Sequence, residues 1–129
     1  MYGFDISLSG NMDDIRSRVV DELQKVGFGV LTEIDVAAIL KKKINVDRRP
    51  YLILGACNPK LANQAINADP DVGLLLPCNV VLREEQDGSV TVAFMDPAAV
   101  LGLVDKQGVE QLAGEVRVLL ESVRDALKS

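Results

Sequence analysis

The two cysteines, Cys57 and Cys78, are the residues of this sequence with the greatest capacity for chemistry. Each is followed by an asparagine at one end of a predicted strand, in the segments Ala56-Cys57-Asn58-Pro59 and Pro77-Cys78-Asn79. Cys57 also directly precedes a predicted helix, and the positive end of a helix dipole lowers the pKa of a nearby thiol. The backbone N–H groups at the same helix start could instead bind an anion. We therefore treat both Cys-Asn pairs as candidate site residues.

The position of a third candidate, Asp96, follows from a predicted hairpin. Asp87-Gly88 is the strongest hairpin signal in the chain. With a two-residue loop, Val81 would face Phe94 and Asn79 would face Asp96, so that Cys78 emerges beside Asp96. If the central strand that ends at Cys57 neighbours this hairpin, all these residues meet at one end of the sheet. That adjacency is an assumption at this point.

Three kinds of chemistry suit a cluster of Cys57, Asn58, Cys78, Asn79 and Asp96. Two thiols could cycle with a disulfide, although the Cys-x-x-Cys spacing of redox motifs is absent. Two thiolates could bind a soft metal such as Cu(I), or zinc if Asp96 or a second subunit completed the ligand set. A single activated thiolate could act as a nucleophile, but it would lack the usual histidine partner.

A purely structural role explains the same residues. Cysteine is among the most buried residue types and often packs as a small apolar side chain. Asn58 and Asp96 are well placed to be helix N-caps. The residues by themselves favour this structural interpretation, and the choice depends on whether the two thiols meet in space.

Composition and charge narrow the classes of function. The 129 residues are 48% apolar, which suits one domain, 1–129, with its own core. The chain has no histidine, which removes Ser-His and Cys-His catalysis and every zinc site that uses histidine. A net charge of −5 argues against attraction to nucleic acid or to an anionic membrane. Because neither a signal peptide nor a membrane-spanning run is evident, we predict a cytoplasmic protein. The missing catalytic groups favour a non-enzymatic role over an enzyme.

A basic cluster interrupts this acidic chain at Lys41-Lys42-Lys43 and Arg48-Arg49. It could hold an anionic ligand or partner. The favoured interpretation is a solvated helix end, because three lysines complement the negative end of a helix dipole. Apart from Tyr51 no aromatic residue lies nearby, so the cluster does not have the composition of a single-strand nucleic-acid site.

Hydrophobic periodicity predicts an α+β fold. Residues 2–9 alternate strictly between apolar and polar, as in a half-buried strand, whereas 51–57 is continuously apolar, as in a central strand. We predict a two-layer sandwich, a mainly antiparallel sheet of about five strands with helices packed on one face. The early β-α-β stretch leaves room for one parallel pairing. The predicted strands are 2–9, 30–34, 51–57, 78–82 and 90–94; the predicted helices are 12–26, 36–43, 59–68 and 109–127, with a short helical turn at 98–100.

The long C-terminal helix carries a broad apolar stripe. Seven large apolar residues on one helix of a small chain could cover the sheet and also supply a dimer face. We therefore predict a homodimer. The stripe consists of Val109, Leu112, Val116, Leu119, Leu120, Val123 and Leu127.

Across nearly its whole length the chain resembles the bacterial and archaeal family known as domain of unknown function 302. The resemblance implies a compact α+β fold, a dimer and no established activity. Many relatives have a histidine near Val36, Gly-Asn-Pro in place of Ala56-Cys57-Asn58-Pro59, and leucine in place of Cys78, so the thiols mark a cysteine-containing subgroup. The matching segments are 27–35, 55–59, 76–80, 87–88 and 95–97.

Two hypotheses of function follow. The leading one is a small ligand-, metal- or redox-linked binding domain with a thiol-lined pocket near Cys57, Cys78 and Asp96. The alternative is a non-catalytic dimeric interaction module in which the cysteines are structural. Hydrolase and dehydrogenase chemistry is disfavoured because neither its catalytic groups nor its cofactor loops are present.

Overall fold

A computed structural model describes residues 1–128, and its elements follow the order that the sequence predicts. Each predicted element is present, with ends that shift by about two residues or fewer. One short 3₁₀ helix, η1, was not predicted. The strands are β1 (Gly3–Leu8), β2 (Gly29–Asp35), β3 (Tyr51–Cys57), β4 (Cys78–Glu84) and β5 (Val90–Met95); the helices are α1 (Met12–Lys25), α2 (Val36–Ile44), α3 (Pro59–Ala68), η1 (Pro70–Leu75), α4 (Pro97–Leu101) and α5 (Val109–Leu127).

The five strands form one sheet in the order β1-β5-β4-β3-β2. Each neighbouring pair is antiparallel, which confirms the predicted architecture. The parallel pairing that the β1-α1-β2 stretch left open does not form, because β1 and β2 lie at opposite edges of the sheet. The assumed adjacency of the central strand and the hairpin is confirmed, since β3 pairs with β4.

The hairpin between β4 and β5 has a different register from the predicted one. Phe94 pairs with Val80 and not with Val81. The loop has three residues, 86–88, because the N–H that precedes it donates to the carbonyl that follows it at 2.8 Å. Gly88 closes the loop in the left-handed conformation, with φ of 87°, as expected for a loop of this length. The one additional loop residue shifts every partner of β4 by one position.

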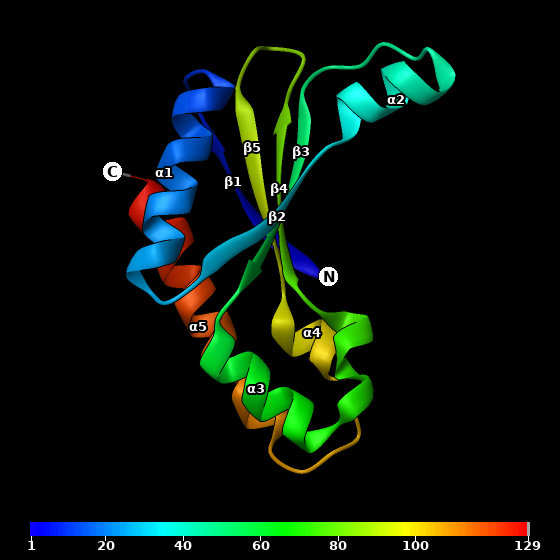
Figure 1. Cartoon of the computed structure of the whole chain (residues 1–129). Coiled ribbons are helices and arrows are strands. Elements are labelled where there is room, and N and C mark those ends of the chain that lie inside the picture. The colour runs from blue at the N-terminus through cyan, green and yellow to red at the C-terminus, as the bar shows by residue number, and fades with distance from the viewer. Residues whose placement is uncertain (129) are drawn as a thin grey trace.

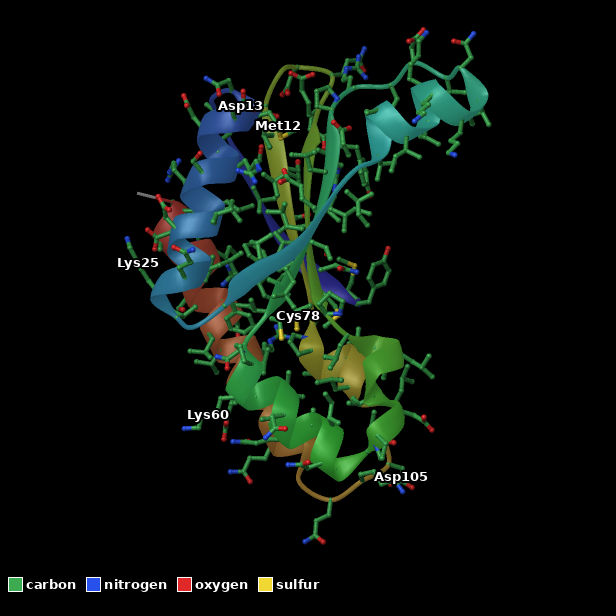
Figure 2. The ribbon with its side chains drawn as sticks, viewed as in Figure 1. Met12, Asp13, Lys25, Lys60, Cys78 and Asp105 are labelled. Atoms are coloured by element: carbon green, nitrogen blue, oxygen red, sulfur yellow. The ribbon has the colours of Figure 1, made fainter. Side chains whose placement is uncertain are left out.

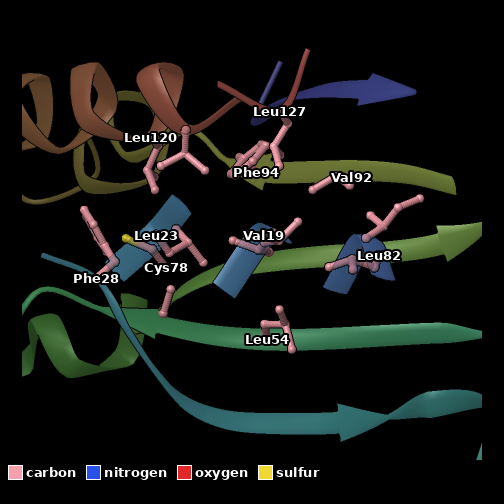
Figure 3. Close-up of a cluster of buried hydrophobic side chains, with 14 of the residues drawn as sticks. Val19, Leu23, Phe28, Leu54, Cys78, Leu82, Val92, Phe94, Leu120 and Leu127 are labelled. Atoms are coloured by element: carbon pink, nitrogen blue, oxygen red, sulfur yellow. The ribbon is translucent and has the colours of Figure 1, made fainter. Parts of the chain in front are cut away.

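Helices α1 and α5 cover one face of the sheet, as Figure 1 shows. The inward stripe of α1, Ile15, Val19 and Leu23, is buried against apolar strand residues and the second half of α5. Figure 3 shows the labelled members of this core, among them Cys78. Six of the seven stripe residues of α5 are likewise buried. The prediction that this stripe forms a dimer face is therefore wrong, because the stripe is buried within the chain.

A second, smaller core lies at one end of the sheet. There α3, η1 and α4 pack around the first half of α5 (Figure 1). Each of the three begins with an Asn or Asp side chain that accepts a backbone hydrogen bond, followed by a proline at the first helical position. These local signals fix where the helices start and therefore where the end of the sheet is closed.

The other face of the sheet is not covered by a helix of the described part of the chain. Helix α2 projects away from the body on this side (Figure 1), and it has no buried residue. Within residues 1–128, no helix is both long and apolar enough to cross a membrane.

Candidate functional site

Both cysteines line one cavity, at the end of the sheet that α3 and α5 close. Its volume is about 30 Å³, room for one or two water-sized groups. Figure 2 shows Cys78 at this end of the sheet, beside α3 and α4. The lining side chains are almost wholly apolar apart from the two thiols and one amide. They come from Phe28, Ala56, Cys57, Asn58, Leu61, Ala62, Ala65, Leu76, Pro77, Cys78, Leu101, Leu112 and Val116.

The sheet register brings the two cysteines to neighbouring positions, and both side chains line the cavity. Cys78 is the first residue of β4 and pairs with Ala56, the neighbour of Cys57 at the end of β3. The residue before Ala56 has to be small because the packing there is close. A Cβ on Gly55 would lie 2.9 Å from Cγ of Pro77. The chain therefore passes from β3 to α3 with Cys57 held beside the start of β4.

Both thiols are free and protonated at neutral pH. Burial and, to a lesser degree, the neighbouring Cys57 together raise the pKa of Cys78 to about 11. Burial also raises the pKa of Cys57, which is half-buried. The prediction that the start of α3 lowers the pKa of Cys57 is therefore wrong. The cause of the rise is loss of hydration of the thiolate on burial.

Asn58 supports the site as the N-cap of α3. Its side-chain oxygen accepts a hydrogen bond from the N–H of Leu61 at 3.2 Å. Gly27, at the end of α1, lies against its amide, since a Cβ on Gly27 would come within 2.9 Å of Nδ2. The turn between α1 and β2 therefore packs directly on the residue that follows Cys57.

The other two predicted site residues lie elsewhere. Asn79 is exposed on the uncovered face of the sheet. Asp96 is buried, but its carboxylate caps α4 by accepting from the N–H of Ala98 at 2.9 Å and forms an ion pair with Arg117. Neither residue lines the cavity. Asp96 therefore joins α4 to α5. Its predicted role as a helix N-cap accounts for the contact with α4 and not for the ion pair with α5.

The possible metal ligands of the cavity are the two sulfur atoms. In the part of the chain that the structure describes, no group of three or more His, Cys, Asp or Glu side chains is placed to hold a metal. A zinc site completed by Asp96 is therefore not formed within one chain. A two-ligand site for a soft ion remains compatible with this geometry.

Sequence reasoning missed the apolar walls of the cavity. Phe28, Leu61, Leu112 and Val116 come from the turn after α1, from α3 and from α5. In the sequence they are ordinary members of amphipathic patterns, and no local signal distinguishes a cavity wall from the rest of the core. Only the packing of α3 against α5 brings them around the thiols.

The fold is similar to that in a crystal structure of an uncharacterized conserved protein DUF302 from Bacillus stearothermophilus. The two are 27% identical, with 97% of each chain covered and a TM-score of 0.89. No curated protein matches the chain. The resemblance inferred from the sequence is confirmed, while the cysteine-containing subgroup stays a prediction. Because the family described as domain of unknown function DUF302 matches residues 4–127, the chain belongs to the DUF302 family.

Proposed function

We propose that the chain is a non-catalytic binding domain that holds one Cu(I) ion between Cys57 and Cys78. The observation that carries the proposal is the shared cavity. Two thiols line a space of about 30 Å³, enough for a single ion and little else. The apolar side chains around them offer few competing oxygen or nitrogen donors.

The ligand set favours Cu(I) over other metals. Thiolates are soft ligands and select soft ions, whereas Cu(II) favours nitrogen and oxygen donors in a tetragonal arrangement. Zinc generally takes four ligands. Because residues 1–128 offer no group of three His, Cys, Asp or Glu ligands, a d¹⁰ monovalent ion that accepts two sulfur ligands fits best.

The local charges suit an anionic complex of one Cu(I) and two thiolates. Its single negative charge would lie beside the N-terminus of α3, which begins at Pro59 directly after Asn58. The positive end of a helix dipole stabilises such a charge. Since both thiols are protonated in the metal-free chain, binding must release two protons, and the affinity for Cu(I) should rise with pH.

Anaerobic competition with a chromogenic Cu(I) chelator tests the proposal. We expect one Cu(I) per chain and the release of two protons per ion. Cys57→Ala and Cys78→Ala should each weaken binding by at least about 100-fold, more than the loss of an outer-shell partner does. Met95→Leu is the matched control, because it removes a sulfur that does not line this cavity and should leave the affinity unchanged.

Two results would overturn the proposal. One is stoichiometric Cu(I) binding that survives either cysteine substitution, which would place the ion elsewhere. The other is a wild-type chain that fails to compete for Cu(I) with both thiols demonstrably reduced. The structural interpretation of the cysteines would then stand.

A further inference from the structure

A second hollow lies on the uncovered face of the sheet, over β1, β5 and β4. Its volume is about 380 Å³, within the range of small-molecule sites. The small residue Ala93 stands at its middle, directly opposite Asp5 on one side and Val81 on the other. The strand side chains that line the hollow are those of Asp5, Asn79, Val81, Arg83, Ala93 and Met95.

The hollow has one acidic and one basic side chain on different strands. Asp5 lies on β1 and Arg83 on β4, with β5 between them. Two strand spacings place their backbones at least about 10 Å apart. Within residues 1–128 the two side chains form no ion pair with each other, since Arg83 pairs with Glu85. The hollow therefore presents two separated charges of opposite sign.

Asp5 is an unusual residue for its position in β1. Aspartate is depleted in strands, and this one ends a row that continues through Ala93, Val81 and Ile53. In the part of the chain that the structure describes, its carboxylate has neither an ion-pair nor a hydrogen-bond partner. Departures from local sequence rules of this kind are expected at functional sites.

Arg83 can still bind a ligand beside its ion pair. Its Nε donates to Oε1 of Glu85 at 2.7 Å, which orients the guanidinium group. The other N–H groups of a guanidinium form a planar fork that matches a carboxylate. The side chain is 40% exposed, so a ligand in the hollow can reach it.

The part of the hollow between the two charges is apolar. Val81, Ala93 and Met95 line it and are half-buried, so an apolar group placed on them would remove further area from water. Asn79, which the sequence marks as a candidate ligand-binding residue, lines the same hollow and is exposed. Its amide supplies both a donor and an acceptor.

We propose that this hollow binds an α-amino acid with an apolar side chain. The ammonium group of the ligand pairs with Asp5, its carboxylate pairs with Arg83, and its side chain lies over Val81 and Ala93. A ligand with both charges matches the hollow, whereas a ligand with one charge leaves the other protein group without a partner. The hollow shares no lining residue with the thiol cavity, so the inference is independent of the Cu(I) site.

NMR titration of the isotope-labelled full chain with L-leucine tests the proposal. We expect a Kd below about 1 mM, with shifts concentrated in β1, β4 and β5. Two analogues test the recognition without any substitution in the chain. Isoamylamine lacks the carboxylate and isocaproate lacks the ammonium group, and each should bind at least about tenfold more weakly than L-leucine because one charge-assisted hydrogen bond is lost.

Substitutions locate the site. Asp5→Asn and Arg83→Gln should each weaken L-leucine binding at least about tenfold. Ala93→Leu keeps both charges but fills the middle of the hollow, and should abolish binding. Asp13→Asn is the matched control, because it removes the same charge from an exposed position of α1 (Figure 2) and should leave the Kd unchanged.

Three results would overturn the proposal. One is a wild-type chain that shows no shift with millimolar L-leucine; Asp5 would then serve only to protect the edge strand β1 from pairing. The second is an analogue that binds as tightly as L-leucine. The third is binding that both Asp5→Asn and Ala93→Leu leave unchanged, which would place the ligand elsewhere. Because the analogues are tested on the unmodified chain, the test holds even if a variant fails to fold.

Discussion

Cys78 is a deeply buried residue with a reactive side chain. Only 6% of the residue is exposed, and it packs in the same core as Leu23 and Phe28 (Figure 3). Cys57 is half-buried and lines the same cavity. The two cysteines should therefore differ in how much they stabilise the fold, even if they share a ligand.

This difference predicts unequal costs of substitution in the metal-free chain. Cys78→Ala removes a buried sulfur from a packed core and should cost about 1–2 kcal/mol of unfolding free energy. Cys57→Ala should cost less than about 1 kcal/mol, because its site is already partly open to solvent. Urea unfolding under reducing conditions measures both. Equal costs would contradict the burial seen here.

At the scale of elements, the turn after α1 supports the site through Gly27. This residue has φ of 89°, and a Cβ on it would approach Nδ2 of Asn58 to 2.9 Å. Gly88 has nearly the same φ, 87°, but no atom within 4 Å of the position of a Cβ. The two glycines therefore share a backbone requirement and differ in their surroundings.

Gly27→Ala should cost more stability than Gly88→Ala. Gly88→Ala should cost about 1 kcal/mol from backbone strain alone. Gly27→Ala adds displacement of the α3 cap, and should also change the affinity for Cu(I), which Gly88→Ala should leave unchanged. Paired urea unfolding and Cu(I) competition check this. Identical behaviour of the two variants would show that the contact with Asn58 is unimportant.

The elements also show which features the sequence could predict. Helix caps and helix stops such as Asn58 and Gly27 act within a few residues, so their positions can be predicted from the sequence. The register of the hairpin was missed because Gly88 closes a three-residue loop, which Asp-Gly alone does not distinguish from a two-residue one.

The missed features of the site depend on contacts between distant segments. The pairing of Cys78 with Ala56 joins two strands that the sequence separates by α3 and η1, and it had to be assumed. The raised pKa of Cys57 likewise comes from side chains that close over it. Local rules gave only the helix dipole and could not reveal how far the thiol is buried.

For the whole molecule, burial of Cys78 should make the free energy of unfolding fall at alkaline pH. Its pKa is about 11 in the folded chain against an ordinary value of 9.0. Between these values the unfolded thiol ionises while the folded one keeps its proton, so unfolding releases a proton and stability falls as pH rises. The contribution is fully present below about pH 9 and is lost as pH rises through about 11.

The metal-free chain should therefore lose roughly 2–3 kcal/mol of unfolding free energy across this range from Cys78 alone. The comparison is with Cys78→Ala, which isolates the contribution of this thiol. The wild type should lose more stability than this variant between pH 9 and pH 11. Parallel losses in the two chains would mean that the thiol is not shielded from water.

In the proposed site, two sulfur atoms in one cavity bind Cu(I). X-ray absorption at the copper edge of the anaerobically loaded chain tests it most directly, because it reports the oxidation state and the ligand atoms together. We predict Cu(I) with two sulfur ligands and no nitrogen or oxygen ligand. A shell that contains nitrogen or oxygen, or copper in the Cu(II) state, would contradict a site made of Cys57 and Cys78 alone.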